Sequence, residues 1–277
     1  MTARKNIFLK KRILIYGLGK SGISTFKFLK KKADVYLFDD NQKINQKIIN
    51  FNQLLKLEFD RIIISPGINI LDCKLSKFLK KNFSKIYTDL DVFYSFYGNK
   101  SITITGSNGK STTAKILYDV LVDQNRDVRL VGNIGNPVLS EKKISKKTFF
   151  VIEASSYQLD YSKIFSTKYG VILNISADHI ERHRSLTNYV NAKFKLLDSQ
   201  TRQSFAYVKE NDKQIAKRLK KSKFKQKIYT VDTSSINKIL NQLNNKYFSS
   251  EGNKENLSFV LKIASKLKLN NTKLIKT

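Results

Sequence analysis

The sequence predicts an α/β fold, with an N-terminal Rossmann-like parallel-sheet domain followed by a P-loop ATPase-type α/β domain. Short apolar runs rich in Ile, Val and Tyr alternate with amphipathic stretches, a pattern typical of buried parallel strands joined by crossover helices. In each half of the chain, a glycine-rich turn follows the first such run, at residues 17–22 and 105–111. We therefore expect one phosphate-binding turn in each domain.

The first domain is expected to span residues 1–97 and to begin with a β-α-β unit. Between its first two apolar runs, Ile23, Phe26 and Leu29 recur at helical spacing, with lysines on the opposite face. A helix of this kind joins parallel strands of one sheet. The expected strands of this domain are RILIY (12–16), DVYLF (34–38) and RIIIS (61–65).

The pattern restarts after a break at YGNKS (97–101), so the second domain is expected to span residues 98–277. Its lysine-rich stretch at residues 209–227 is expected to form a solvated surface. The expected elements are the strand SITIT (101–105), the helix KSTTAKILYDVLVDQ (110–124), the strands VRLVG (128–132), TFFVIEA (148–154) and GVILNIS (170–176), and the helix ENLSFVLKIASKLKL (255–269).

The bulk composition excludes several functional classes. The chain has 277 residues, of which 41% are hydrophobic and 27% charged, so a packed core is expected. No apolar run approaches the roughly 20 residues that a membrane helix needs. The single cysteine, Cys73, cannot form an internal disulfide, which favours a reducing, cytoplasmic location. The net charge of +30 is spread along the chain, so we expect a solvated surface and no dedicated nucleic-acid partner. Since no apolar run is long enough, no membrane partner is expected either.

The first glycine turn, GLGKSG (17–22), matches the pattern G-x-G-x-x-G between a strand and a helix. This spacing allows a tight turn and lets the helix N-terminus bind an anion. Asp39 and Asp40 end the next strand, where an acidic side chain commonly contacts a ribose, and SPG (65–67) follows the third strand. NAD, another diphosphate nucleotide, and a tight turn without any ligand all fit this pattern.

The second glycine turn, TGSNGKST (105–112), is a shortened phosphate loop, because isoleucine replaces the first glycine of G-x-x-x-x-G-K-[ST]. Gly106 and Gly109 still let the backbone curl so that its amides face inward. Lys110 can neutralise the charge of β- and γ-phosphates, and Ser111 can offer its hydroxyl to Mg²⁺. The loop therefore predicts phosphate binding.

Further polar residues end other expected strands of the second domain. Glu153 ends one strand, and Asp178 and His179 follow another, so all three could lie beside the phosphate loop as magnesium ligands. His183 lies four residues after His179, but with no third ligand and no HExxH motif a zinc site is not expected. Taken alone, Lys193 indicates only a solvated lysine on a helix.

The sequence resembles one known family through a set of motifs in a fixed order. The motifs are GLGKSGIS, SPGI, TGSNGKSTT, VGNIGNP, EASSYQL, LNISADHIERH and YVNAK. Together they are similar to those of the Mur ligases of peptidoglycan synthesis, and most closely to the branch that joins D-glutamate to UDP-N-acetylmuramoyl-L-alanine. That family uses the shortened phosphate loop, which accounts for the isoleucine.

The resemblance implies an ATP-dependent, magnesium-requiring ligase. ATP would phosphorylate the free carboxylate of UDP-N-acetylmuramoyl-L-alanine, and the amine of D-glutamate would displace phosphate to form an amide. The implied catalytic residues are Lys110, His179 and Lys193. The implied metal-binding residues are Ser111, Glu153, His179 and Lys193, the last as its carbamate.

The same resemblance implies two sets of binding residues, and the glycine turn of the first domain is expected to bind uridine diphosphate rather than NAD. The implied ATP contacts are Thr105, Gly106, Ser107, Asn108, Gly109, Lys110, Ser111, Thr112 and Asn253. The implied substrate contacts are Gly19, Lys20, Ser21, Asp39, Asp40, Ser65, Pro66, Gly67 and Asn133.

The sequence departs from the family pattern in two places. Gly252 stands where a GxHN element would carry histidine, with Asn253 retained, so contacts to adenine are expected to differ. The family's C-terminal ligase domain is expected to be absent, which would impair ligation and make a separate C-terminal domain a candidate partner. Two alternatives stay open, a non-catalytic nucleotide-binding fragment or one part of a split ligase, and an NAD-dependent oxidoreductase is disfavoured by the second phosphate loop.

Overall fold

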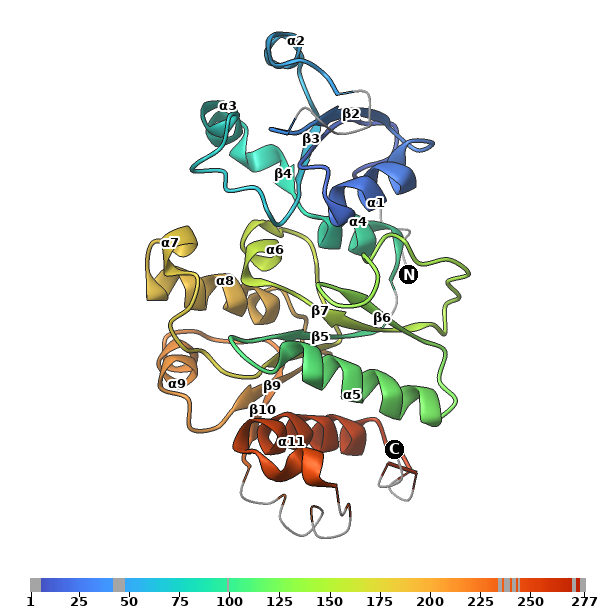
Figure 1. Cartoon of the computed structure of the whole chain (residues 1–277), viewed down its shortest axis with the longest axis vertical. Coiled ribbons are helices and arrows are strands. Elements are labelled where there is room, and N and C mark those ends of the chain that lie inside the picture. Colours follow the sequence, from blue (N-terminus) through green and yellow to red (C-terminus); the bar gives the residue numbers. More distant parts are fainter. Residues whose placement is uncertain are drawn as a thin grey trace. The chain divides into compact units, whose positions relative to one another are not determined.

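The computed structural model divides the chain into two compact units (Figure 1). Unit 1 comprises residues 1–98, 136–142 and 157–165, and unit 2 comprises residues 99–135, 143–156 and 166–277. Both units contain a purely parallel sheet, which confirms the α/β fold expected from the sequence. The structure describes residues 6–41, 48–98, 100–233, 236, 240, 243, 245–270 and 273–274.

The sheet of unit 1 has four strands in the order β2-β1-β3-β4. One of its two interior strands is the apolar run RILIY, whose Ile13, Leu14 and Ile15 are fully buried. The strands are β1 (Arg12–Tyr16), β2 (Asp34–Phe38), β3 (Arg61–Ile64) and β4 (Ile86–Tyr87). The helices of this part of the chain are α1 (Lys20–Leu29), α2 (Phe51–Leu55), α3 (Ser76–Lys81), the 3-10 helix η1 (Phe83–Lys85) and α4 (Asp89–Phe96).

The sheet of unit 2 has six strands in the order β10-β9-β8-β5-β7-β6, so the strand before the phosphate loop is central. Its strands are β5 (Ser101–Thr105), β6 (Val128–Gly132), β7 (Phe149–Glu153), β8 (Tyr169–Ile172), β9 (Phe205–Lys209) and β10 (Lys227–Val231). The helices are α5 (Lys110–Asp123), α6 (Ser156–Tyr161, which runs into unit 1), α7 (Ile180–His183), α8 (Leu186–Asp198), α9 (Lys213–Lys220), the 3-10 helix η3 (Lys246–Ser249) and α11 (Glu251–Lys266).

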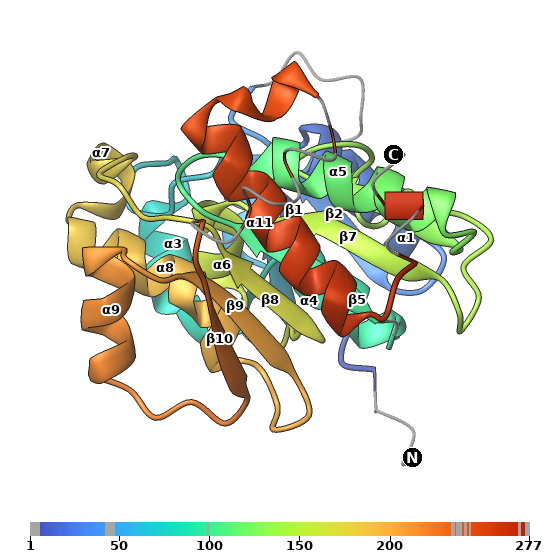
Figure 2. The same cartoon turned by 90° about the horizontal axis from the view of Figure 1, so that it is seen from below.

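Helices cover both faces of the unit 2 sheet. Helices α5 and α11 lie side by side on one face (Figures 1 and 2), where Ile102 and Ile104 of β5 enter a common core with Val260 of α11. Helix α8 covers the other face, because its Leu197 lies directly against Gly170 of β8. Because helices cover both faces, the sheet is open at the edge where its strands begin and at the edge where they end.

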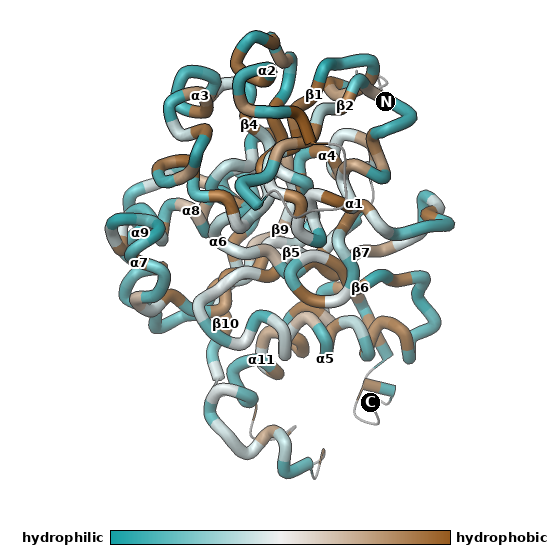
Figure 3. Tube along the Cα trace, turned by 45° about the horizontal axis from the view of Figure 1, so that its top comes forward, coloured by the Kyte–Doolittle hydropathy of each residue, from teal (hydrophilic) through white to brown (hydrophobic). Residues whose placement is uncertain are grey.

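A polar helix, α9, lies on the outside of unit 2. Figure 3 shows α9 as a mostly hydrophilic segment, and within it only Ile215 is buried. This helix occupies the lysine-rich stretch that was expected to be a solvated surface. Across the described parts of the chain, no helix is both long enough and apolar enough to cross a bilayer.

Candidate functional site

The glycine turn of unit 1 is shaped by close backbone contacts. Gly17 has a φ of +90°, and its amide donates to the carbonyl of Phe38 at 3.0 Å. A Cβ on Gly22 would lie 1.9 Å from the carbonyl oxygen of Gly17, so only glycine lets α1 start this close to the turn. Gly19 caps α1 and is exposed, as is Lys20, so the first amides of the helix are open to an anion.

Acidic side chains at the end of β2 are fixed against this turn. An Asp39 oxygen accepts from the Leu18 amide at 2.5 Å, and the Tyr16 hydroxyl donates to Asp40 at 2.8 Å. Burial, and next the bond to Asp40, raise the pKa of Tyr16, so the hydroxyl stays protonated and keeps donating. The Ser65 hydroxyl donates to the Gly17 carbonyl at 2.6 Å, which brings the SPG turn to the glycine turn.

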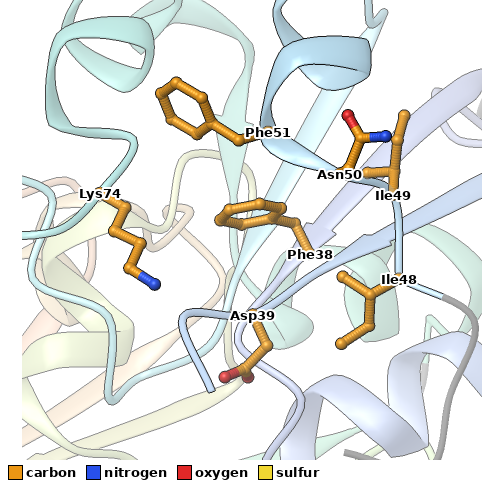
Figure 4. A pocket seen from close by; sticks show the side chains of 7 residues that line it. All are labelled: Phe38, Asp39, Ile48, Ile49, Asn50, Phe51 and Lys74. Carbon is orange, nitrogen blue, oxygen red and sulfur yellow. The ribbon is translucent and has the colours of Figure 1, made fainter. Parts of the chain in front are cut away.

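A pocket of about 640 Å³ opens beside Asp39. Figure 4 shows Phe38 and Phe51 as neighbours near Asp39, with their rings tilted relative to each other and Lys74 beside them. Of the expected substrate contacts, Asp39 lines this pocket and Asp40 adjoins it, since Lys74 donates to the Asp40 carbonyl at 3.1 Å. Ser21 instead bonds the buried Asp89, and Pro66 and Gly67 continue the turn that Ser65 holds.

The phosphate loop of unit 2 closes on itself. Gly109 has a φ of +81°, and a Cβ there would lie 2.2 Å from Oδ1 of Asn256. The Lys110 ammonium donates to the carbonyls of Gly106 at 3.0 Å and Ser107 at 2.7 Å. The loop therefore holds its lysine against its own carbonyl groups, above the N-terminus of α5.

Three expected site residues converge at the start of α5. The Ser111 hydroxyl donates to Oε2 of Glu153 at 2.8 Å, and the Asn133 amide donates to Oε1 at 3.1 Å. Glu153 is 1% exposed, and within the described residues it has no cationic partner. A buried carboxylate beside a serine hydroxyl and a phosphate loop suits Mg²⁺, which takes one or two carboxylates together with phosphate oxygens.

Lys193 reaches the same loop from α8. Its side chain is 1% exposed, and its ammonium donates to the Gly106 carbonyl at 2.8 Å, the group that Lys110 also contacts. Burial, and next the nearby Lys110, lower the pKa of Lys193, and Asp178 opposes them, with the net result that this pKa is about 7. The ring of Tyr189 lies 4.3 Å below the ammonium, and its hydroxyl is 3.1 Å from that of Ser107.

The two histidines differ in environment. His179 caps α7 with a φ of 53° and lies 3.4 Å from Asp178, with its ring 6.4 Å from that of Tyr189. His183 is buried, and its Nε2 is 3.0 Å from the Ser156 hydroxyl. Within the described residues, no three His, Cys, Asp or Glu side chains form a cluster that could hold a metal by themselves.

A second pocket, of about 600 Å³, is lined in part by the phosphate loop. Asn253 lines it opposite Asn108, and its own amide donates to the Tyr247 carbonyl at 2.7 Å. Gly252 leaves open space where a side chain would project. The other lining residues are Gly109, Thr112, Asn174, Ile175, Ser176, Lys209, Asp212, Glu255 and Asn256.

Sequence reasoning missed the residues that brace this pocket. Asn174 accepts from the Asn108 amide at 2.9 Å and donates to Glu255 at 2.9 Å, which ties the loop to α11. Asn256 accepts from the Thr113 hydroxyl at 3.1 Å. Asn256 follows Asn253 by three residues on a helix, and this spacing could have identified it.

Comparison with known proteins gives a family and several relatives. The Mur ligase middle domain family matches residues 104–273. The UDP-N-acetylmuramoylalanine–D-glutamate ligase of Rickettsia felis is 36% identical over 214 residues, which are 73% of this chain and 47% of that protein. The corresponding ligase of Clostridioides difficile is 32% identical over 245 residues, 82% of this chain and 54% of that protein. The chain thus spans about half the length of the curated relatives it matches.

Two solved structures share the fold. The UDP-N-acetylmuramate:L-alanyl-gamma-D-glutamyl-meso-diaminopimelate ligase from Neisseria meningitides superposes with a TM-score of 0.63 and 14% identity, over 96% of each chain. A murein peptide ligase from Psychrobacter arcticus gives a TM-score of 0.58 and 14% identity, over 96% of this chain and 67% of that one. At this identity the likeness concerns the fold.

Proposed function

The chain belongs to the Mur ligase family, and on that basis we propose that it supplies the substrate-binding and ATP-binding parts of a ligase that joins D-glutamate to UDP-N-acetylmuramoyl-L-alanine. Unit 1 would bind the uridine diphosphate portion at the glycine turn, and unit 2 would bind ATP. The reaction would make a peptidoglycan precursor in the cytoplasm.

One observation supports this proposal most directly. Ser111 and Asn133 both donate to the buried carboxylate of Glu153, at the N-terminus of the helix that follows the phosphate loop. A bound Mg²⁺ would supply positive charge that offsets the repulsion between a triphosphate and a carboxylate substrate. Ser111 and Glu153 would hold it, with His179 and carbamylated Lys193 as the expected ligands of a second ion.

The chemistry then assigns tasks to the chain's own groups. The substrate carboxylate attacks the γ-phosphorus, ADP leaves, and the D-glutamate amine displaces phosphate from the acyl group. Lys110 would turn from the loop carbonyls to the transferring phosphoryl group, whose charge it stabilises. The amides of the loop would orient the β- and γ-phosphates. Asn133, already fixed by Glu153, would contact the substrate.

Lys193 has the properties that carbamylation needs. With a pKa of about 7, a large fraction of this amine is neutral near pH 7 and can attack the carbon of CO₂, releasing one proton to solvent. The carbamate anion so formed would lie near the Lys110 ammonium, which favours it. With ¹³C-labelled bicarbonate, we expect a carbamate carbon signal that persists in Lys195→Arg and is lost in Lys193→Arg. A signal unchanged in Lys193→Arg would contradict this assignment.

Thermal unfolding with each ligand tests the proposal. A ligand at about 100 times its Kd stabilises the unit that binds it by roughly 2.7 kcal/mol. UDP-N-acetylmuramoyl-L-alanine and Mg-ATP should each raise the unfolding temperature. Lys110→Ala should abolish the ATP effect, and Lys20→Ala should weaken only the effect of the UDP substrate.

The matched controls are Lys115→Ala on α5 and Lys27→Ala on α1, both exposed lysines on the same helices. Neither control should change the response to ligand. Stabilisation by Mg-ATP alone would support the alternative of a nucleotide-binding module, and stabilisation by NAD in place of the UDP substrate would revive the oxidoreductase hypothesis.

A further inference from the structure

Unit 2 contains a second cleft at the edge of its sheet away from the phosphate loop. Lys100 immediately precedes β5, Phe149 opens β7 and Tyr169 opens β8, and all three line a cleft of about 700 Å³. The C-terminal end of α11 forms another wall, through Lys266–Leu269. The phosphate loop follows the opposite end of β5, so this cleft is separate from the nucleotide pocket.

The cleft carries a large excess of positive charge. Its one lining carboxylate, Asp127, is already neutralised by Arg129 at 2.5 Å and accepts from the Thr148 hydroxyl at 2.5 Å. The hydrogen bond from Thr148, and next Arg129, lower the pKa of Asp127, so this carboxylate stays ionised and bound to these two residues. Six cationic residues line the cleft: Lys100, Arg126, Lys146, Lys147, Lys266 and Lys268. Within the described part of the chain, none of these six has an ion-pair partner.

A high lysine content alone does not explain this arrangement. In the nucleotide pocket, the lining lysine Lys209 is paired with Glu255 at 2.5 Å. In the groove between α5 and α11, the lining lysine Lys115 is paired with Asp119 at 2.6 Å. These two clefts of unit 2 therefore pair their lining lysines with carboxylates, and the cleft lined by Lys100 and Lys266 does not.

The cations of the cleft repel one another. Lys168, beside the cleft, has a lowered pKa, first because of burial and then because of Lys100 and Lys266. Lys266 is also drawn over the Phe205 ring, at 4.1 Å from its centre. An anion bound among these groups would relieve the repulsion, so the cleft favours the binding of a ligand with several negative charges.

We propose that this cleft binds a small polyphosphorylated anion. Its volume is that of a small-molecule site. The cations converge on one cleft rather than following a stripe across the surface, which favours a compact ligand over a nucleic-acid strand. Phe149 and Leu267 line the floor as partly exposed apolar groups, so an organic portion of the ligand would have a surface to contact.

Amide NMR of the full chain with inorganic tripolyphosphate, without magnesium, tests the proposal. Saturable shifts are expected at Lys146, Lys147 and Lys268. Lys146→Glu combined with Lys147→Glu should weaken this binding about tenfold or more, because two attractive charges become repulsive. The control pair Lys221→Glu with Lys223→Glu changes the net charge equally at exposed lysines of the same unit and should leave the affinity within about twofold.

The outcomes separate the proposal from its alternatives. An equal loss in both pairs would show that only the overall charge matters, and shifts confined to residues 105–111 would show binding at the phosphate loop alone; each result would overturn the proposal. Lys266→Gln provides a second cleft variant if the first pair disturbs folding. Tighter cleft binding of ATP than of tripolyphosphate would place the base on the apolar floor. Tighter binding of an oligonucleotide whose contacts extend beyond the cleft would overturn the compact-ligand assignment.

Discussion

Lys193 is one of many lysines in the chain, yet its side chain is almost completely enclosed. Its ammonium reaches the Gly106 carbonyl, and Tyr189 lies beneath it. A buried charge is costly unless it is paired, and the charged group that affects Lys193 most, Lys110, has the same sign, with Asp178 opposing it less strongly. The chain therefore carries at this position a side chain that destabilises it in the absence of ligands.

We predict that Lys193→Met stabilises the chain near neutral pH in bicarbonate-free buffer. The pKa of Lys193 is about 7 in the folded state and near 10.5 when exposed, so between these values the unfolded state binds more protons. The wild type should gain stability relative to Lys193→Met as the pH rises from 7 towards 10. Chemical denaturation of both proteins across this range measures the difference, and a gap that widens with pH would contradict the assignment.

At the scale of elements, the two glycines of the turn before α5 have close neighbours where a Cβ would lie, whereas Gly252 on α11 has none. Gly109 is left-handed and lies against Asn256, whereas a Cβ on Gly252 meets nothing within 4 Å. Substitution of Gly109 and of Gly252 by alanine therefore gives a matched pair. The same added methyl group is expected to destabilise the chain at the first position and to stabilise it at the second.

Gly109→Ala should destabilise the chain by more than about 1 kcal/mol, from left-handed strain alone, and should abolish stabilisation by Mg-ATP. Gly252→Ala should stabilise α11 by up to about 1 kcal/mol, since alanine is the better helix former. Denaturant unfolding and ATP-dependent thermal shifts measure both effects. Tight ATP binding by Gly109→Ala would show that the loop tolerates a rearranged Asn256.

The elements also show what the sequence could predict. Strands β1, β2, β5 and β6 match their expected bounds because each is a compact apolar run. Strand β10, at the sheet edge, was not identified because only Val231 of its residues is buried. The phosphate loop is contiguous and was readable, whereas the contacts of Asn174 and Asn256 with it span far-apart segments and arise only from the tertiary structure.

At the scale of the whole molecule, the chain passes from one unit to the other after residues 98, 135, 142, 156 and 165. Within unit 1, Asp91 of α4 binds one of these later segments. Its Oδ1 accepts from the Ser162 hydroxyl at 2.8 Å and from three consecutive amides that follow, and its Oδ2 accepts from the Thr88 amide at 2.9 Å. Asp91 is fully buried.

Asp91→Asn should destabilise unit 1 by at least about 2 kcal/mol, because an amide presents one acceptor where the carboxylate satisfies donors on both oxygens. Asp34→Asn is the matched control: its side chain is 57% exposed and, among the described residues, paired only with Arg12, so a loss within about 1 kcal/mol is expected. Urea unfolding compares the two variants. Equal losses would mean that Asp91 does not hold the later segment in place.

The bonds of Asp91 also bear on the order of events at the ribosome. The first sheet is complete once β4 has been made, but the donors that satisfy the Asp91 carboxylate lie at residues 162–165. Until that stretch emerges, a nascent unit 1 must leave a buried charge without its hydrogen bonds or keep α4 open to water. The N-terminal half is therefore expected to gain full protease resistance only after much of the second unit has been synthesised.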